Sequence, residues 1–449
     1  MFLVAFFLLY QALQIIFAPA ILLYFIVRFF KKKSLGSWCE RFGFVPRTKI
    51  YTCRFRGGPR GEGPTSPRFI LWIHAISVGE VLSIEHFITM CKRKHPNLIC
   101  YLTCGTTTGM QVAKKLGADY VSFMPFDFLI PMLLAFKRIN PSALVIVEAE
   151  IWPNFLMLAH FKKIPLYLLN GRINPTSAHK RRFIGFLYKL FTSIFAPSER
   201  AAEQFKSIGI PSNNISVLGD IKAFNVVEKQ KGLTIISPTF NNTYTVILAG
   251  SIHAAELDIY LSSYLKLKLQ IPNLRLILAP RHFHWQQELI NKLIALNITY
   301  TLWEDKTPTK TSLQELGATI TDTFTNHEVL VVCKLGVLFS LYPFATIYCL
   351  GGTFIPVGGH NLLEPAVWAK PCLIGPYYHM CFDVAEQLHI AGGLIKTTSA
   401  KELQDAILNL AHNQALCSQM GKANATWITL QAKNTKAKLG NFIKNIGRF

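Results

Sequence analysis

Short apolar runs alternate with amphipathic, helix-like stretches along most of the chain. Each run is apolar throughout, which is typical of strands buried on both faces of a parallel sheet. We therefore predict strand–helix–strand repeats and a doubly wound α/β domain over roughly 35–225. The runs that support it are "FILWIHA" (69–75), "LICYLT" (98–103), "ALVIVEAE" (143–150), "PLYLLN" (165–170), "SIFAP" (193–197) and "ISVLG" (215–219).

The same pattern restarts after a polar stretch, "EKQKGLTIISPTFNNT" (228–243). We predict a linker over 226–243 and a second doubly wound domain over 244–420, with a cleft between the facing edges of the two sheets. Residues 421–449 read as a helix that could pack back on the first domain. The runs of the second domain are "YTVILAG" (244–250), "LRLILAP" (274–280), "ITYTLWE" (298–304), "VLVVC" (329–333), "TIYCLGG" (346–352) and "KPCLIGP" (370–376).

The chain opens with an uncharged apolar stretch, residues 1–27, which ends in "RFFKKK" (28–33). It exceeds the roughly 20 residues that cross a bilayer as a helix. Its charges follow the apolar core, unlike those of a cleaved signal peptide. We predict a membrane anchor at 1–28, and the positive-inside rule then places the rest of the protein in the cytoplasm. Gln11, Gln14 and Pro19 interrupt the stretch and leave open a helix that lies in the membrane interface.

Composition narrows the class of protein. Of 449 residues, 51% are hydrophobic and 16% charged, which one membrane anchor plus globular domains would explain. The net charge of +22 raises the possibility of nucleic acid, but the basic residues fall in short groups without an aromatic-interleaved RNA motif. An anionic lipid surface or a phosphorylated lipid substrate explains the excess as well.

The ten cysteines are scattered, which favours a reducing compartment. The Gly/Pro-rich stretch 54–69 reads as an exposed loop.

Polar residues and glycines gather just after the predicted strands. In open α/β sheets ligands bind outside the carboxyl ends of the strands, so this distribution predicts one site shared by two domains. For the threonines we favour a solvated loop or a helix cap. The residues are Ser77, Gly79, Glu80, Thr106, Thr107, Thr108, Glu148, Glu150, Asn170, Arg172, Asp220, Lys222, Ser251, His253, Glu256, Arg281, His282 and the stretch 351–364.

The second domain contributes "GGTFIPVGGHNLLEP" (351–365), in which a helix is expected to begin near Asn361. Free N–H groups at such a helix start would hold a phosphate without metal. Arg281 in "APRH" adds a second anion-binding group, and Glu364 could accept hydrogen bonds from ribose hydroxyls. His253, His282 and His360 do not have the spacing of zinc ligands and are interpreted as hydrogen-bonding residues, so no metal is predicted.

The first domain contributes carboxylates. Glu80 follows the strand 69–75 at the start of a predicted helix, where it could act as a base or only complement the helix dipole. Glu148 and Glu150 follow the strand at 143, and Glu148 could pair with Arg172 or Lys222. Two domains, a nucleotide-type pocket and an isolated carboxylate resemble the glycosyltransferases that are built from two Rossmann-like domains, the GT-B architecture.

Ten motifs, in order, are similar to those of the lipid A 3-deoxy-D-manno-octulosonic acid (Kdo) transferase family. The resemblance implies a Gram-negative-type inner-membrane enzyme that transfers Kdo from CMP-Kdo to a lipid A precursor, with inversion and without metal or cofactor. The motifs are "WIHAISVGEV" (72–81), "LTCGTTTG" (102–109), "MPFD" (124–127), "EAEIWPN" (148–154), "NGRI" (170–173), "GDIKAF" (219–224), "AGSIHAAE" (249–256), "APRH" (279–282), "LGVLFSLY" (335–342) and "GGHNLLEP" (358–365).

Carried over motif by motif, the resemblance implies Glu80 as general base, with Glu150 and Lys222 stabilising the transition state. The chain departs from the family pattern at Ala149, at Val337, and in "GDIKAF", which lacks a usual aspartate. Val337 removes a side-chain acceptor, so contacts there would come from the backbone. The segments that would contact CMP are Pro280 and Arg281; Gly336, Val337 and Leu338; and Asn361, Leu362, Leu363 and Glu364.

Two other functions stay open. One is a membrane-surface glycosyltransferase of the same architecture that uses a UDP-sugar. The other is a membrane-tethered protein that binds RNA or anionic lipid through its positive charge, although charge alone does not require carboxylates and glycine loops at strand ends. For a Kdo transferase the partners are CMP-Kdo, the lipid A precursor and the inner membrane, and nucleic acid is not a partner.

Overall fold

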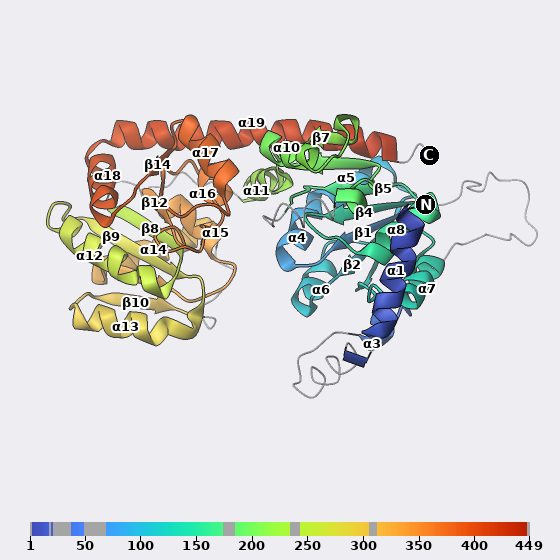
Figure 1. The fold of residues 1–449 in the computed structure, drawn as a ribbon. Coiled ribbons are helices and arrows are strands. Elements are labelled where there is room, and N and C mark those ends of the chain that lie inside the picture. The colour runs from blue at the N-terminus through green and yellow to red at the C-terminus, as the bar shows by residue number, and fades with distance from the viewer. Residues whose placement is uncertain are drawn as a thin grey trace, which may run out of the picture. The chain divides into compact units, whose positions relative to one another are not determined.

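The computed structural model describes residues 2–17, 19–20, 37–48, 69–173, 185–233, 243–304 and 312–446. The chain divides into two compact units (Figure 1). Unit 1 comprises Met1–Ile221 and Asn434–Phe449, and unit 2 comprises Lys222–Lys433.

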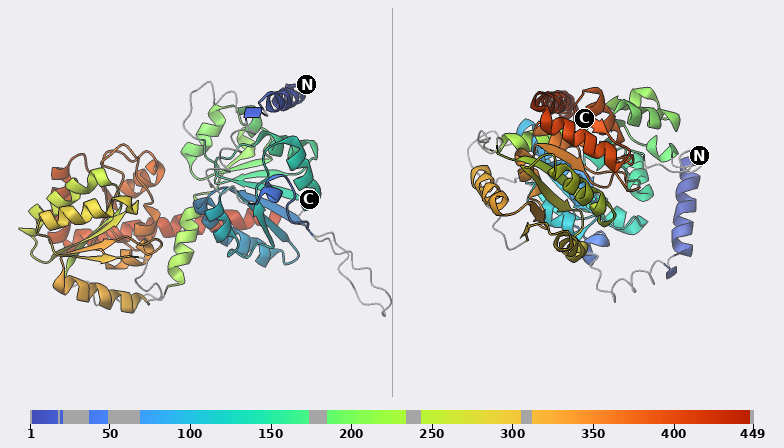
Figure 2. Two further views of the ribbon diagram at one scale, coloured as in Figure 1. Left: turned by 90° about the horizontal axis from the view of Figure 1, so that it is seen from below. Right: turned by 90° about the vertical axis from the view of Figure 1, so that its left-hand side faces the viewer.

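Unit 1 is built on a seven-stranded sheet in the order β3-β2-β1-β4-β5-β6-β7, and every neighbouring pair is parallel. Helices cover both faces of the sheet (Figures 1 and 2). The strands are β1 (Ile70–Ala75), β2 (Ile99–Cys104), β3 (Tyr120–Phe123), β4 (Ala143–Val147), β5 (Leu166–Leu169), β6 (Ser193–Ala196) and β7 (Ile215–Val217). The helices include α1 (Phe2–Ile16), α3 (Trp38–Arg41), α4 (Val78–Ser83), α5 (Glu85–Lys94), α6 (Thr107–Ala113), α7 (Leu129–Ile139), α8 (Pro153–Phe161) and α10 (Glu199–Ser207).

The core of unit 1 is aromatic at its centre. The ring of Trp72 on β1 lies 4.8 Å from that of Phe155 on α8 and 5.2 Å from that of Phe136 on α7, and all three side chains are buried. These edge-on contacts pack two helices against the central strand, which fixes the strand end that follows Trp72.

Unit 2 is built on a second parallel sheet of seven strands, in the order β10-β11-β9-β8-β12-β13-β14. The strands are β8 (Thr245–Ile252), β9 (Leu274–Pro280), β10 (Tyr300–Trp303), β11 (Val329–Val332), β12 (Ile347–Leu350), β13 (Cys372–Ile374) and β14 (Leu394–Lys396). The helices include α11 (Ile221–Lys231), α12 (Leu257–Lys268), α13 (Gln286–Ala295), α14 (Leu313–Asn326), α15 (Leu338–Leu341), α16 (Leu363–Val367), α17 (Phe382–Ile390), α18 (Ala400–His412) and α19 (Gln414–Ile446).

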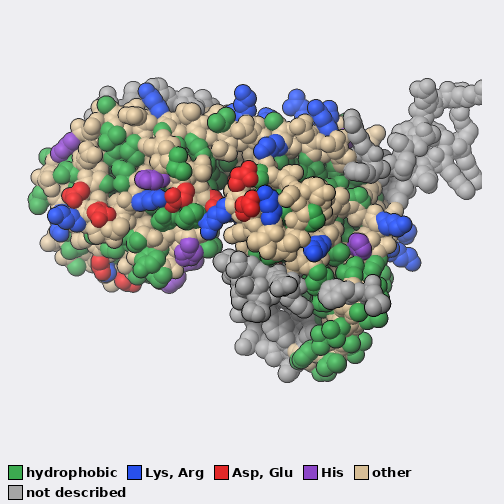
Figure 3. Space-filling view, turned by 45° about the horizontal axis from the view of Figure 1, so that its top comes forward, with side chains coloured by type: hydrophobic (Ala, Val, Ile, Leu, Met, Phe, Trp, Pro, Cys, Tyr) green, Lys and Arg blue, Asp and Glu red, His purple; other side chains and the backbone are tan. Residues whose placement is uncertain are grey.

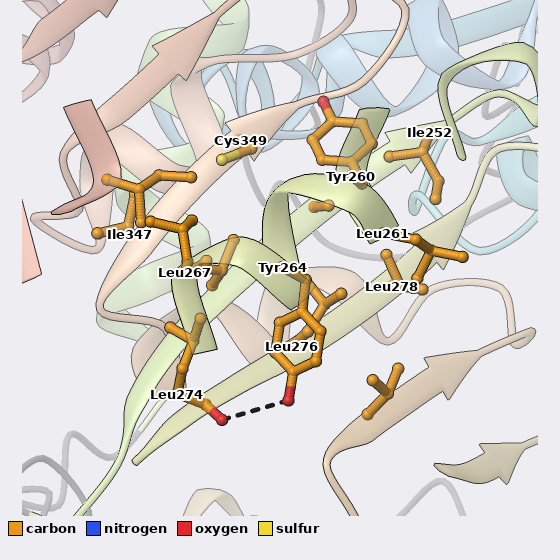
Figure 4. Close-up of a cluster of buried hydrophobic side chains, with 14 of the residues drawn as sticks. Ile252, Tyr260, Leu261, Tyr264, Leu267, Leu274, Leu276, Leu278, Ile347 and Cys349 are labelled. Atoms are coloured by element: carbon orange, nitrogen blue, oxygen red, sulfur yellow. Dashed lines mark hydrogen bonds between the residues drawn. The ribbon is translucent and has the colours of Figure 1, made fainter. Parts of the chain in front are cut away.

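Helix α12 packs on this sheet through an apolar face (Figure 4). Tyr260, Leu261, Tyr264 and Leu267 on this helix belong to one buried cluster with side chains of β8, β9 and β12. The hydroxyl of Tyr264 donates to the carbonyl oxygen of Leu274 at 3.4 Å, so a buried phenol keeps a polar partner.

The predicted α/β class with two parallel sheets is confirmed. Each of the apolar runs named above contains a strand of the structure, and the sequence missed only β3 and β14 among the described strands. Both are edge strands, and residues of both are only partly buried. The other two edge strands, β7 and β10, were predicted, so an edge position alone does not explain why these two were missed.

The C-terminal helix α19 contributes residues to both units, since the division falls between Lys433 and Asn434. Within unit 1, the ring of Phe442 lies 4.5 Å from Phe195 on β6 and 5.0 Å from Tyr167 on β5. Residues 226–231, predicted as linker, form the second half of α11, while 234–242 lie outside the described residues.

Helix α1 packs on unit 1 through polar side chains. The hydroxyl of Tyr10 donates to Asp127 Oδ2 at 3.1 Å, and Gln14 Nε2 donates to the carbonyl oxygen of Asp127 at 2.7 Å. Apolar side chains of α1, including Leu8 and Ile16, are exposed (Figure 3). Among the described residues, no helix is both long and apolar enough to cross a membrane. Residues 1, 18 and 21–28 of the predicted anchor, and 54–68 of the predicted loop, lie outside those residues.

Candidate active site

The carboxyl ends of three adjacent strands bring polar side chains together in unit 1. Strand β1 pairs with β4 through His74 and Ile146, and β4 pairs with β5 through Val147 and Leu169. The residues that follow these strands include Glu80 after β1, Glu148 and Glu150 after β4, and Asn170 after β5. This edge of the sheet is where a doubly wound fold binds its ligand.

Glu80 lies in the first turn of α4, and its carboxylate folds back toward the strand that precedes the helix. Its Oε2 accepts from the backbone N–H of Ile76 at 2.8 Å, and its Oε1 accepts from the hydroxyl of Ser77 at 3.0 Å. Ser77 in turn caps the helix by accepting from the backbone N–H of Glu80 at 3.4 Å. Ser77 therefore caps α4, and the bond from its hydroxyl to the Glu80 carboxylate holds the two side chains together.

The environment of Glu80 also changes its acidity. The side chain is 8% exposed, and burial raises the pKa of its carboxyl to about 7, with Glu148 and Glu150 adding to the rise. The hydrogen bond from Ile76 opposes this shift. A carboxylate whose pKa lies near 7 can accept a proton at physiological pH, which is the property that a general base needs.

Glu148 and Asn170 both adopt left-handed backbone conformations at the ends of their strands, with φ of 64° and 57°. Such conformations are uncommon outside glycine and often occur at functional sites. Asn170 is fully buried, and neither of its side-chain polar atoms has a hydrogen-bond partner within the part of the chain that the structure describes. Close to it in sequence, Arg172 forms an ion pair with Asp220 at 2.7 Å.

The other two predicted catalytic residues differ in their surroundings. Glu150 is half-buried in the turn after β4, and burial raises the pKa of its carboxyl, as does the neighbouring Glu148. Lys222 is the second residue of α11 and the first residue of unit 2. The roles of both in stabilising a transition state stay predictions.

Thr106 follows β2 and caps α6, because its hydroxyl oxygen accepts from the backbone N–H of Gly109 at 3.0 Å. The interpretation of this threonine as a helix cap is confirmed.

In unit 2, the carboxylate of Glu256 organises the glycine-rich loop after β12. It accepts from the backbone N–H groups of His253 at 3.0 Å, Gly352 at 2.7 Å, Thr353 at 3.0 Å and Phe354 at 3.0 Å. Its side chain is completely buried. These donors satisfy the buried charge and tie the loop to the end of β8.

A helix does begin near Asn361, as predicted, but not all of its first N–H groups are free. Helix α16 begins at Leu363 and has only five residues, and the Oδ1 of Asn361 accepts from the backbone N–H of Leu363 at 3.0 Å. One of the N–H groups expected to hold a phosphate is therefore occupied by the protein itself. The side chains of Leu362 and Leu363 are buried, so any contact of theirs with a ligand would come from the backbone.

The remaining predicted CMP-contacting residues lie in the loops of unit 2. Pro280 ends β9, and the exposed Arg281 follows it, with its backbone N–H donating to the carbonyl oxygen of Ile252 at 2.9 Å. Gly336 has a φ of 81°, Val337 is the residue that caps α15, and Leu338 begins that helix. Burial raises the pKa of Glu364, while Lys229 acts in the opposite direction.

Three histidines lie beside Arg281. His253 Nε2 lies 3.0 Å from His360 Nε2, and the His253 ring centroid lies 5.9 Å from that of His282. Burial lowers the pKa of His360 to about 4, and the nearby Arg281, His253 and His282 lower it further. In the described ranges, no group of three or more His, Cys, Asp or Glu side chains is arranged to hold a metal ion.

The sequence of the chain matches known proteins along most of its length. Residues 36–225 match the family model for 3-deoxy-D-manno-octulosonic-acid transferase (kdotransferase). The 3-deoxy-D-manno-octulosonic acid transferase of Chlamydia pneumoniae is 29% identical over 369 residues, which cover 79% of this chain and 79% of that protein. The transferase of the same name from Aquifex aeolicus is 29% identical over 340 residues, which cover 76% of this chain and 85% of its own. The predicted kinship with Kdo transferases is confirmed. The prediction that the chain is a glycosyltransferase is confirmed with it.

A solved structure shares the fold. The UDP-GlcNAc 2-epimerase of Neisseria meningitidis, bound to UDP-GlcNAc, is 15% identical and has a TM-score of 0.55, over 81% of this chain and 98% of its own. At this identity the likeness concerns the fold alone.

Two buried carboxylates that hold loops and helix ends in place were not given a role from the sequence. Glu256 was noted only as part of a polar cluster, and its position in "AGSIHAAE" was the one available signal. Asp127 ends the motif "MPFD" and proves to be buried, with its carboxylate accepting from the backbone N–H groups of Asn154 at 3.0 Å and Phe155 at 2.9 Å. It thereby caps α8, the helix that follows the loop of Glu148 and Glu150.

Proposed function

We propose that the chain transfers Kdo from CMP-Kdo to a lipid A precursor, lipid IVA, in lipopolysaccharide synthesis. The observation that carries the proposal is the carboxylate of Glu80, which is oriented by Ile76 and Ser77 and whose pKa is raised to about 7 at the carboxyl end of a central strand. The similarity to Kdo transferases then indicates the reaction that this base would catalyse.

The chemical step is a single displacement. Glu80 removes the proton from an acceptor hydroxyl as the hydroxyl oxygen attacks the anomeric carbon of Kdo. The bond between that carbon and the phosphate oxygen breaks, and CMP leaves with the electron pair, so the anomeric configuration inverts. A positioned general base contributes about 10²–10⁴-fold to such a reaction. Glu150 and Lys222 stabilise the transition state.

The leaving CMP is held by unit 2. Arg281 provides an exposed guanidinium for the phosphate, and the half-buried Glu364 accepts from ribose hydroxyls. Backbone groups supply the other contacts at Pro280, Gly336 to Leu338 and Asn361 to Leu363. On this proposal these fixed donors take the place that a divalent cation has in other nucleotide-sugar enzymes.

The acceptor is a lipid, and the exposed apolar side chains of α1 support a location at the inner membrane. Leu8 is 62% and Ile16 is 68% exposed, on a helix whose polar side chains Tyr10 and Gln14 contact the protein. This division suits a helix that anchors the enzyme at the cytoplasmic face of the bilayer. Such an enzyme could add one or more Kdo units.

Radiolabelled CMP-Kdo with tetraacylated lipid A precursor, in the presence of EDTA, tests the proposal. The wild type should transfer label to the lipid, and Glu80→Gln should reduce transfer by about 10²–10⁴-fold. The matched control is Glu85→Gln, since Glu85 is an exposed residue of the next helix. No transfer by the wild type would reject the reaction, and near-normal transfer by Glu80→Gln would reject the base. Turnover of a UDP-sugar instead of CMP-Kdo would favour the other glycosyltransferase function.

A further inference from the structure

Three histidines converge on one edge of the sheet of unit 2 from three neighbouring strands. His253 follows β8, His282 follows β9, and His360 ends the glycine-rich loop after β12. Strand β8 pairs with both β9 and β12, so the convergence follows from the strand order. Arg281 and His282 are exposed and His253 and His360 are partly exposed, so the cluster is open to a ligand.

The geometry of His253 and His360 requires them to share one proton. Their Nε2 atoms lie 3.0 Å apart, and the rings are stacked at 5.3 Å with an interplanar angle of 8°. At this distance one Nε2 must carry a hydrogen and the other must accept it. The pair can take up one further proton at an outer nitrogen, which makes the shared hydrogen bond charge-assisted. If both rings were protonated, each Nε2 would carry a hydrogen, and the two Nε2–H groups would repel each other.

Contacts of the backbone hold His253 and His360 in place before a ligand binds. Glu256 Oε2 accepts from the backbone N–H of His253 and from that of Gly352, which fixes the two segments to one atom. Gly352 has a φ of 71°, and a Cβ at this position would come within 3.1 Å of His360 Nε2. The close approach of the loop to the ring therefore depends on a glycine there.

The charged and titratable groups around the pair oppose its protonation. Arg281 and His282 face it from the end of β9, with His284 beside His282 at 5.8 Å between ring centroids. Burial lowers the pKa of His360 and of His253, and the nearby Arg281 and His282 lower both further. Glu256 acts in the opposite direction on His253, but its oxygens are occupied by the backbone donors. Together these groups favour the pair without the further proton when no ligand is bound.

An anion bound among these groups would offset the field of Arg281 and His282 and favour the protonated pair. We propose that His253 and His360 form a proton-linked anion site, which takes up one proton from solvent when the phosphate group of a nucleoside monophosphate binds and releases it when that group leaves. The identity of the nucleotide rests on the proposed function; the proton linkage does not. Through this linkage the enzyme would stabilise CMP as it forms, and its affinity for CMP would fall as pH rises.

Calorimetric titration of the full-length protein with CMP tests the linkage. With EDTA present, the experiment is run at one pH in buffers of different ionisation enthalpy, because the dependence of the heat on the buffer gives the number of protons taken up. The wild type should take up protons, and its affinity for CMP should fall by up to about tenfold per pH unit above neutrality. Both effects should be lost in His253→Asn and in His360→Asn. The control is His412→Asn, since His412 is exposed at the end of α18. Cytidine, which lacks the phosphate, should show no uptake.

A second measurement separates this inference from the proposed function. The ring nitrogens of His253 and His360 are followed by NMR against pH, with and without inorganic phosphate. An upward shift of about one pH unit in the midpoint of the pair supports the linkage even if Kdo transfer is never found. CMP binding without proton uptake, uptake that persists in both variants, or a midpoint that phosphate does not move would overturn it, even in an active Kdo transferase.

Discussion

The backbone N–H of Ile76 donates to the carboxylate of Glu80 at 2.8 Å, and the hydroxyl of Ser77, which caps the same helix, donates to it at 3.0 Å, so the proposed base also supports the cap of its own helix. The two roles can be separated by substitution. Glutamine keeps an oxygen that can accept from Ile76 and an amide that can bond Ser77, whereas alanine keeps neither. The loss of a cap costs about 0.5–2 kcal/mol.

We therefore expect Glu80→Ala and Glu80→Gln to be equally inactive but unequally stable. Transfer assays should show a similar loss in both, and urea unfolding should show a lower free energy of unfolding for Glu80→Ala alone. Retained activity in Glu80→Gln would show that Glu80 serves only as a cap.

The pH dependence of transfer should report the same carboxyl. A base must be ionised, so with a pKa of about 7 the value of kcat/KM should rise as pH increases through neutrality. The folded pKa lies above the ordinary glutamate value of 4.5, so folding disfavours the charged form. The contribution of Glu80 to stability is therefore greatest below about pH 4.5 and is lost as pH rises to about 7. The free energy of unfolding of Glu80→Gln should not show this dependence on pH. A wild-type rate that is flat from pH 5 to 8 would contradict the assignment.

How much the sequence could predict depends on the kind of feature. The central strands follow from their apolar runs, and the place of Glu80 follows from the strand before it. The bond from Ile76 depends on side-chain direction, and the pKa of Glu80 depends on burial and on the charge of residues distant in sequence such as Glu148, which no local pattern reports. The pairing of His253 with His360 likewise joins residues 107 positions apart, across a loop whose shape Glu256 sets.

Asn361 shows the opposite case, in which a local rule was applied too broadly. Glycines followed by a polar residue and an apolar run predicted a helix start with free N–H groups. The helix starts at Leu363, within two residues of Asn361, but the Oδ1 of Asn361 already accepts from the backbone N–H of Leu363. An asparagine side chain readily accepts from the backbone two residues further on, so it competes with a ligand for the N–H groups of the helix start.

Asp127 should be important for the stability of unit 1. Its carboxylate caps α8 through Asn154 and Phe155 and accepts from Tyr10 of α1. Asp127→Asn removes one charged acceptor from this buried network, and we expect a loss of about 1–3 kcal/mol. Tyr10→Phe removes only one bond and should cost about 0.5–1.5 kcal/mol.

Urea unfolding of both single variants and the double variant measures the coupling of Asp127 and Tyr10. The double variant should lose less than the sum of the two, because the residues share a hydrogen bond. Strict additivity would show that Tyr10 and Asp127 do not share a hydrogen bond in solution.

Glu256→Gln should loosen the loop that carries His360. The amide has a single oxygen in place of two, so at least one of the bonds from Gly352, Thr353 and Phe354 is lost or weakened. We expect a loss of about 1.5–3 kcal/mol in the free energy of unfolding and weaker binding of CMP. Asp258→Asn is the matched control, because Asp258 is an exposed acid on the next turn. Unchanged stability would mean that hydrogen bonds between backbone groups hold the loop without the Glu256 carboxylate.

The last turns of α19 should be required for the folding of unit 1. The ring of Phe442 is 7% exposed and contacts Phe87 on α5, Tyr167 on β5 and Phe195 on β6. Phe442→Ala removes this packing, and large-to-small changes of this kind cost about 3–5 kcal/mol. Urea unfolding monitored by near-UV circular dichroism measures the effect, with Leu430→Ala on an exposed part of the same helix as control. Leu430→Ala should leave the unfolding midpoint unchanged. An equal effect of the two substitutions would mean that the helix matters only through its own helicity, because Phe442 packs on the sheet of unit 1 and Leu430 is exposed.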